Sequence, residues 1–175
     1  SMVMVMIAIS KSSAERIVEV LDTQSDIYDP KKPITEVKDG SIEFRNVSFS
    51  YVKDKKKECL KNINLKIKSG ETIGIIGGTG SGKSSLVNLI PRFYDVTGGE
   101  LLVDGINIKE ANQKELRKRI GFVPQKGVLF SGTIESNIKY GNEYISDERM
   151  VEDAQIGQGE EFINGKPDKY NDRIA

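Results

Sequence analysis

Apolar and polar residues alternate in the first third of the chain, as they do in strands with one exposed face. In residues 42–49 the alternation shifts by one residue at Arg45 and Asn46, which predicts a strand with a bulge. Residues 63–67 alternate without a break and predict a second strand, after a charged loop at residues 54–58. Strands of this kind are typical of antiparallel sheets, so we expect an antiparallel β layer.

Residues 71–77 have a different pattern, because their apolar side chains follow one another without a polar interruption. This pattern predicts a strand that is buried on both faces of a parallel sheet. Farther on, Leu86, Leu89 and Ile90 recur at helical spacing until Pro91 interrupts the pattern. The order of buried strand, glycine-rich loop and helix predicts an α/β core.

The beginning of the chain predicts an amphipathic leader helix over residues 4–22, because apolar residues recur there at helical spacing, at Ala14, Ile17, Val18 and Leu21. A surface helix packed on the core and the cytoplasmic end of a truncated membrane helix both remain open. The apolar run at residues 2–9 is too short to cross a membrane, which takes about 20 apolar residues. Residues 23–40 are polar and contain prolines, so they predict an extended connector.

Two more helices are predicted from their capping residues. Asn112 with Glu115 three residues later matches a capping box and predicts a helix over residues 113–119. Ser146 precedes two acidic residues and predicts the start of a helix that ends near residue 156. No strand pattern follows this second helix.

The segment LLVDG at residues 101–105 allows two interpretations. An apolar strand that ends in an aspartate can hold Mg²⁺ in nucleotide-binding enzymes, which would make Asp104 a metal ligand. Asp-Gly is also a strong signal for a two-residue hairpin turn, and the apolar residues before it can pair with those at 106–108. We favour the turn.

The charges and the rare residues narrow the possible functions. Lysine plus arginine total 26 and aspartate plus glutamate total 26, so no net field favours nucleic acid or an anionic membrane. Any anion must therefore be held by a local site. The single cysteine, Cys59, rules out an internal disulfide, and the absence of histidine rules out an imidazole base or metal ligand in this chain.

Glycines are concentrated at residues 77–85, GGTGSGKSS, and a known motif accounts for them. Gly77, Gly82, Lys83 and Ser84 match the P-loop pattern G-x-x-x-x-G-K-[ST] between the predicted buried strand and the predicted helix, which is the context that this motif requires. A flexible linker could share the composition but would not have a strand and a helix on either side.

The residue types of this loop suit phosphate chemistry. Backbone N–H groups of residues 78–85 at the positive end of a helix can form a nest for the phosphates of a nucleotide. Lys83 can reach the β- and γ-phosphates as a point charge, and the hydroxyl group of Ser84 can ligate a Mg²⁺ ion that bridges the same oxygens.

Several segments resemble the ABC-type ATPases. The loop GGTGSGKSS is similar to theirs, as are LKNINLKIKSGETIGIIG and GGELLVDGINI, and VSFSY ends at Tyr51, where these domains present an aromatic ring to adenine. The segment at residues 120–141, IGFVPQKGVLFSGTIESNIKYG, resembles the Q-loop segment of ABC exporters. In this family the glutamine at the position of Gln125 contacts Mg²⁺ and the attacking water.

The resemblance implies an ATP and Mg²⁺ site. Its catalytic residues would be Lys83 and Gln125, and its metal ligands Ser84 and Gln125. The expected nucleotide-binding residues are Tyr51, Gly77, Gly78, Thr79, Gly80, Ser81, Gly82, Lys83, Ser84, Ser85 and Gln125.

The resemblance covers residues 39–175 and only the first part of an ABC domain, since the chain contains no LSGGQ-like signature, no later Asp-Glu pair and no switch histidine. The implied fold is an α/β P-loop NTPase core, a parallel sheet with helices, joined to an antiparallel β layer and the start of a helical subdomain. The expected parts are a leader helix (1–22), a connector (23–40), the ATP-binding core (41–125) and the Q-loop with the incomplete helical subdomain (126–175).

The function that this resemblance implies is that of an ATP-binding domain of an ABC exporter, whose membrane-spanning part is fused on the N-terminal side. A second nucleotide-binding domain and the transmembrane domain would be its partners, at the cytoplasmic face of the cell membrane. The chain alone would bind ATP but hydrolyse it negligibly. A soluble ABC ATPase of translation or DNA repair, which would bind nucleic acid, is the alternative, and a regulatory module that never hydrolyses ATP is a third.

Overall fold

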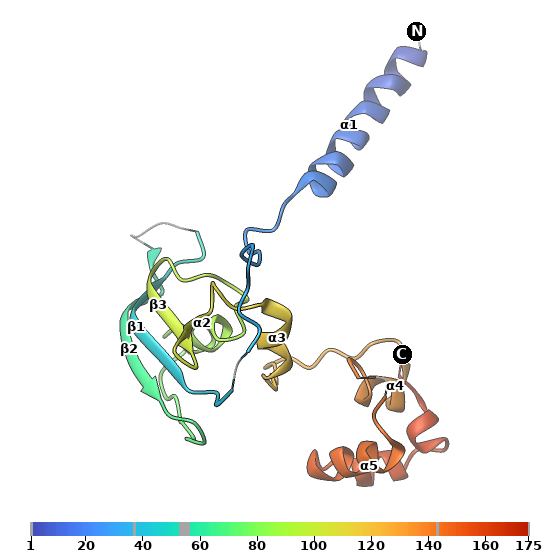
Figure 1. Cartoon of the computed structure of the whole chain (residues 1–175). Helices are drawn as coiled ribbons and strands as arrows, with labels where there is room; N and C mark the ends of the chain where they lie inside the picture. Colours follow the sequence, from blue (N-terminus) through green and yellow to red (C-terminus); the bar gives the residue numbers. More distant parts are fainter. Residues whose placement is uncertain (1, 37, 53–56, 143, 175) are drawn as a thin grey trace. The chain divides into compact units, whose positions relative to one another are not determined.

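The computed structural model describes residues 2–36, 38–52, 57–142 and 144–174 of the chain. It consists of two compact units, Ser1–Gly121 and Phe122–Ala175, and each is described by itself (Figure 1). Residues 54–56 of the predicted charged loop lie outside the described residues.

The first unit contains the expected antiparallel layer. Strands β1 (Ile42–Phe49) and β3 (Gly98–Val103) pair antiparallel, as do β1 and β2 (Leu60–Ile67). Together with β4 (Ile106–Asn107) they form a sheet in the order β2-β1-β3-β4. The register shifts between Phe44 and Val47, so the predicted bulge is confirmed.

Helix α2 (Lys83–Leu89) lies against one face of this sheet (Figure 1). Its Leu89 is fully buried, and the helix ends before Pro91 as the sequence pattern predicted. The core of the unit consists of buried side chains from the strands, from α2 and from the segments that follow: Phe44, Val47, Phe49, Leu60, Leu89, Val96, Leu101, Val103, Ile108 and Leu116.

The hairpin turn at Asp104 and Gly105 is confirmed. Both residues have positive φ, 58° and 73°, as a type I′ turn requires. The turn joins β3 to β4 (Ile106–Asn107), with Val103 paired to Ile106.

Residues 71–77 form no strand, so the prediction of a buried parallel strand was wrong for this structure. Ile76 is 99% exposed, and Ile73 and Ile75 are also exposed. A strand with two buried faces depends on neighbouring strands, and among the described residues none pairs with this segment.

The leader helix is confirmed as α1 (Met2–Asp22), slightly longer than predicted. All of its described side chains are exposed. In the described part of the chain, no helix combines the length and the apolar character that crossing a membrane requires.

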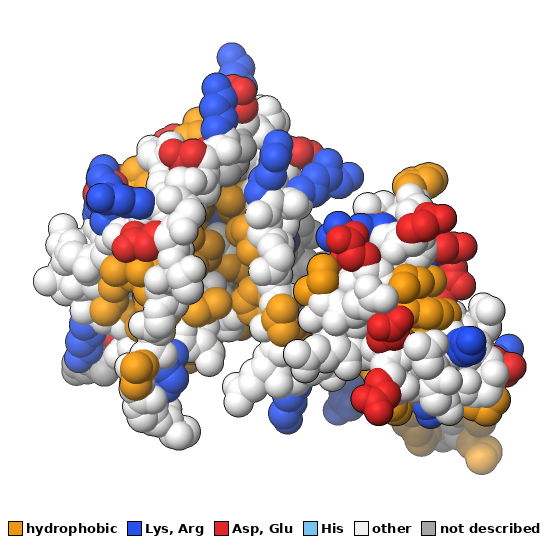
Figure 2. Space-filling view, turned by 90° about the horizontal axis from the view of Figure 1, so that it is seen from below, with side chains coloured by type: hydrophobic (Ala, Val, Ile, Leu, Met, Phe, Trp, Pro, Cys, Tyr) orange, Lys and Arg blue, Asp and Glu red, His pale blue; other side chains and the backbone are white. Residues whose placement is uncertain are grey.

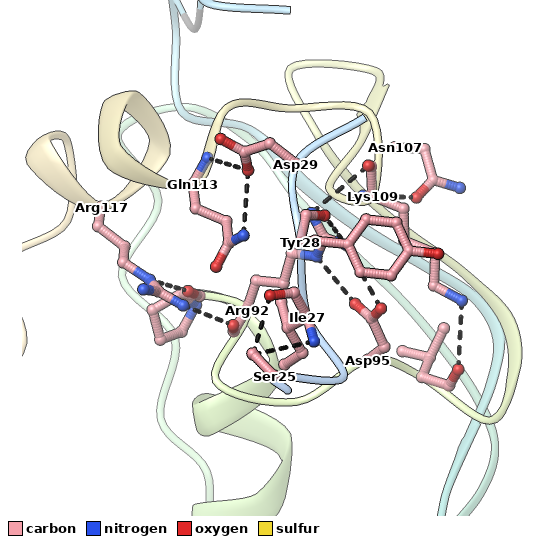
Figure 3. Close-up of polar contacts among 12 residues, drawn as sticks. Ser25, Ile27, Tyr28, Asp29, Arg92, Asp95, Asn107, Lys109, Gln113 and Arg117 are labelled. Atoms are coloured by element: carbon pink, nitrogen blue, oxygen red, sulfur yellow. Dashed lines mark hydrogen bonds and ion pairs between the residues drawn. The ribbon is translucent and has the colours of Figure 1, made fainter. Parts of the chain in front are cut away.

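The connector is fastened to the core by several contacts (Figure 3). Ile34 exchanges two backbone hydrogen bonds of 2.8 Å with the neighbours of Ala111, just before helix α3 (Gln113–Lys118). The guanidinium of Arg92, which is 4% exposed, donates to Asp95 at 2.9 Å and to the carbonyl oxygen of Tyr28 at 3.3 Å. These contacts make the described residues of the connector part of the first unit.

The second unit is a small bundle of short helices. It contains α4 (Ile134–Ile138), α5 (Asp147–Ile156) and α6 (Glu160–Asn164), followed by the short 3₁₀-helix η2 (Lys169–Asn171), and strands β5 (Gly132–Thr133) and β6 (Arg173–Ile174) pair antiparallel. The side chain of Ser146 accepts from the N–H of Arg149, so the predicted cap is confirmed. The core of this unit consists of Ile134, Ala154 and Ile163.

Candidate nucleotide-binding site

The glycine-rich loop leads directly into α2, and two of its glycines adopt left-handed backbone angles. Gly80 has a φ of 78° and Gly82 a φ of 88°. A Cβ atom on Gly82 would lie 2.8 Å from Cδ2 of Leu60 and 3.0 Å from the carbonyl oxygen of Cys59. Position 82 therefore requires glycine for its backbone angle and for space. The first turn of α2, whose N–H groups have no acceptors within the helix, begins directly after it.

Lys83 is the first residue of α2, and its ammonium group lies over the loop. Its Nζ donates to the carbonyl oxygens of Gly77 and Gly78, both at 2.7 Å, and to Oγ of Ser81 at 3.3 Å. All three acceptors are uncharged, so these contacts hold the positive charge in place without neutralising it. A phosphate bound in the loop would supply the missing negative charge.

Ser84 and Ser85 share the first turn of α2 but differ in their surroundings. Ser84 is exposed, whereas Ser85 is only 8% exposed. The N–H of Leu86 donates to the carbonyl oxygen of Gly82 at 2.9 Å. The N–H groups of the three residues before Leu86 lie ahead of this bond, at the start of the helix. The turn thus offers N–H donors and an exposed hydroxyl group beside the charge of Lys83.

This donor set fits a nucleotide with bound Mg²⁺. N–H groups and an ammonium suit phosphate oxygens. Mg²⁺ in such sites takes one or two protein oxygens and completes its shell with phosphates and water, a requirement that the exposed Ser84 hydroxyl meets.

Tyr51 lies just after β1 and reaches α2 through its hydroxyl group, which is 2.9 Å from Oγ of Ser85. Its ring makes T-shaped contacts with Phe49, at a centroid distance of 4.8 Å, and with Tyr94, at 5.0 Å. The side chain is 53% exposed, so part of the ring remains open to a ligand. The structure thus places the hydroxyl group of Tyr51 beside the first turn of α2, and its role toward adenine stays a prediction.

Gln125 belongs to the second unit, where residues 122–131 are exposed and form no helix or strand. Its role toward Mg²⁺ and water stays a prediction.

The carboxylate of Asp104 is hydrogen-bonded to the connector, in agreement with its interpretation as a turn residue. Its carboxylate accepts from the backbone N–H groups of Lys38, Asp39 and Gly40, the last two at 2.8 and 3.1 Å. Burial raises the pKa of Asp104, but hydrogen bonding with Asp39 and with the N–H groups of Lys38 and Gly40 outweighs it, so the pKa lies below its ordinary value. The carboxylate is ionised and tied to the connector.

Sequence reasoning missed the aromatic neighbours of Tyr51. Phe93 and Tyr94 are consecutive exposed aromatic residues after the end of α2, where helical periodicity no longer explains them. These two adjacent aromatic residues were the sequence signal that could have indicated Tyr94. Phe49 was predicted as a strand residue, and it contacts Tyr51 two residues after the end of β1.

Comparison with known proteins identifies the family of the chain. The sequence profile of the ABC transporter family matches residues 60–172. The chain therefore belongs to the ABC transporter family.

Two relatives and one solved structure show the extent of the similarity. ABC transporter B family member 2 of Dictyostelium discoideum is 40% identical over 94% of this chain and 12% of its own length. A Staphylococcus aureus protein named as a multidrug export ATP-binding/permease protein is 45% identical over 80% of this chain and 24% of its own. A bacterial Atm1-family ABC exporter with ATP bound superposes with a TM-score of 0.86 at 32% identity, over 99% of this chain and 30% of that one. The chain thus spans less than a third of each.

Proposed function

We propose that this chain is the ATP-binding part of an ABC exporter and that it binds Mg-ATP at residues 77–85. The observation that carries the proposal is the position of Lys83, whose ammonium is held over the loop by Gly77 and Gly78 directly beside the first turn of α2. A cation and a set of N–H donors so arranged match the β- and γ-phosphates of a nucleotide.

Each residue of the site has a distinct role in this proposal. Lys83 exchanges its loop carbonyl partners for phosphate oxygens, which brings a charge-assisted contact. Ser84 holds the Mg²⁺ ion, which neutralises phosphate charge when it is bound. Tyr51 provides a ring for the purine, and Gln125 orients the attacking water. The loop glycines let the backbone approach the phosphates closely.

The relatives favour an exporter over a soluble ATPase, because the Staphylococcus aureus protein is named for multidrug export and the solved structure is an exporter. We propose that two such domains enclose two Mg-ATP, that hydrolysis drives export by a fused transmembrane domain, and that the domain works at the cytoplasmic face of the cell membrane. Basic and acidic side chains both occur on the face shown in Figure 2, and the net charge of the chain is zero.

The test is calorimetric titration of the chain with Mg-ATP. A charge-assisted contact is worth about 1.5–3 kcal/mol, so Lys83→Ala should weaken binding by roughly tenfold or more. Lys114→Ala, which removes an exposed lysine from α3, is the matched control and should bind as the unmodified chain does. Equal affinities for all three proteins would contradict the proposal.

A further inference from the structure

A buried arginine with a strained backbone lies at the end of α2. Arg92 follows the last residue of this helix by three positions, is 4% exposed and has a φ of 54°. A left-handed conformation is unfavourable for a residue with a side chain, and it persists only where the surrounding contacts enforce it. The guanidinium of Arg92 donates to Asp95 at 2.9 Å and to the carbonyl oxygen of Lys109 at 3.4 Å. A third contact, of 3.3 Å, reaches the carbonyl oxygen of Tyr28 and joins the end of α2 to the connector (Figure 3).

A second arginine reaches the same end of α2 from α3. Arg117 donates to the carbonyl oxygens of Pro91, at 2.9 Å, and of Arg92, at 2.8 Å. Carbonyl groups at the C-terminal end of a helix attract cationic side chains. The start of α3 is bound in turn to the connector, because the N–H of Asn112 donates to the carbonyl oxygen of Ile34 at 2.8 Å. We call this set of residues the clasp: it consists of Tyr28, Ile34, Arg92, Asn112 and Arg117.

Helix α2 is short, so its two ends are not independent of each other. It has seven residues, and an isolated helix of this length is unstable in water. Its C-terminal end is held by the clasp, whereas its N-terminal end carries Lys83 and Ser84 of the proposed ATP site. A partner that orders one end of the helix therefore lowers the cost of ordering the other end for a second partner.

We propose that docking of the connector and binding of Mg-ATP are coupled through α2, so that the docked connector raises the affinity of the site. While the clasp is closed, α2 is ordered before the nucleotide arrives, which lowers the cost of binding. When the connector is released, Arg92 loses its contact with Tyr28, its left-handed backbone relaxes and the end of α2 loosens. This inference rests on the proposed ATP site and adds to it regulation by the connector.

The first measurement is calorimetric titration of the whole 175-residue chain and of Ile34→Pro with Mg-ATP. Proline removes the N–H of Ile34, which donates to the carbonyl oxygen of Glu110 at 2.8 Å, and position 34 lies outside the phosphate loop. The affinity of Ile34→Pro for Mg-ATP should fall by about fivefold or more, which is the lower end of typical couplings between sites. Ile34→Ala keeps the N–H and is the matched control, and it should bind as the unmodified chain does.

The second measurement is hydrogen exchange of the N–H of Asn112, followed by NMR, which reports release of the connector from α3. Coupling is reciprocal, so saturating Mg-ATP should slow this exchange in the unmodified chain by about fivefold or more. Gly70→Ala separates local release from general unfolding, because it strains a turn at a φ of 75° without adding a contact. Exchange at Asn112 and affinity for Mg-ATP should both be the same in Gly70→Ala as in the unmodified chain.

Three results would overturn the coupling while the ATP site stands. Unchanged affinity of Ile34→Pro, together with faster exchange at Asn112, would mean that the connector and the nucleotide are independent. Equal exchange at Asn112 with and without Mg-ATP would mean the same, and this result needs only the unmodified chain, so it decides the question even if Ile34→Pro does not fold. Faster exchange at Asn112 in Gly70→Ala would mean that the connector is released only when the whole unit unfolds. Failure of the ATP site gives a different result, since the unmodified chain would then not bind Mg-ATP, and the coupling would be refuted with it.

Discussion

Asp29 of the connector accepts hydrogen bonds from both the backbone N–H and the side-chain amide of Gln113, each 3.0 Å long. Its second carboxylate oxygen accepts from Nδ2 of Asn112 at 2.9 Å, and Asn112 is the N-cap of α3. A carboxylate at the first turn of a helix satisfies free N–H groups and interacts favourably with the positive end of the helix dipole. The connector thus completes the beginning of α3.

The first prediction concerns this carboxylate. Asp29→Ala should lower the free energy of unfolding by about 1–2 kcal/mol, because it removes a cap and leaves the amides of Asn112 and Gln113 without their partner. Urea denaturation followed by circular dichroism measures the change. Glu19→Ala, which removes an exposed carboxylate from α1, is the control and should shift the midpoint little. Equal midpoints for Asp29→Ala and Glu19→Ala would refute the prediction.

The second prediction concerns Gly82. Gly82→Ala forces a side chain into a left-handed conformation and places a Cβ atom 2.8 Å from Leu60, so it should destabilise the chain and weaken Mg-ATP binding together. Gly70→Ala is the matched comparison, because Gly70 has a φ of 75° but no atom within 4 Å of its added Cβ. It should cost about 1–2 kcal/mol of stability and leave binding intact. Loss of binding in both variants would show that the crowding at Gly82 is unimportant.

The third prediction concerns acid stability. The pKa of Asp104 lies below its ordinary value, so the carboxylate contributes stability above its unfolded pKa of about 4, and this contribution is lost as pH falls through the folded value. Asp104→Asn should therefore flatten the decline of unfolding free energy below about pH 4, while asparagine still tolerates the φ of 58°. Urea denaturation between about pH 3 and 7 checks this, with Asp168→Asn as an exposed control. Parallel curves for Asp104→Asn and the unmodified chain would exclude a role of Asp104.

The fourth prediction concerns catalysis. The 175-residue chain should bind Mg-ATP but release phosphate far more slowly than about 1 s⁻¹, because Lys83 and Ser84 stabilise bound phosphates and rate acceleration needs contacts that strengthen in the transition state. Phosphate release by this chain would be compared with that by a longer protein that extends to a strand ending in Asp-Glu. Turnover near about 1 s⁻¹ that depends on Lys83 would mean that a base within this chain was overlooked, with Glu160 and Glu161 as the first residues to substitute.

The elements that were predicted correctly are those that depend on residues close together in the sequence. The bulge at Arg45 and Asn46, the turn at Asp104 and the cap at Ser146 each depend on a few adjacent residues, and the structure has all three. The motif at residues 77–85 is local in the same sense, because its glycines, Lys83 and the following serines are contiguous. Its role toward phosphate stays a prediction.

The features that were missed depend on residues far apart in the chain. Arg92 and Tyr28 are 64 residues apart in the sequence, and Tyr51 and Ser85 are 34 apart. Contacts over such separations leave no periodic pattern in the sequence from which they could be predicted. The predicted strand at residues 71–77 failed for a related reason. Its apolar run shows what the segment would bury, but burial depends on neighbouring strands that the run does not specify.

The exposure of residues 71–77 has a practical consequence for handling the protein. An exposed apolar segment that forms no strand can pair with the same segment of another molecule, and Ile73, Ile75 and Ile76 provide exposed side chains for it. Aggregation should therefore rise steeply with concentration and begin next to the phosphate loop. Light scattering at increasing concentration would reveal it, and samples for ligand titration are best kept dilute.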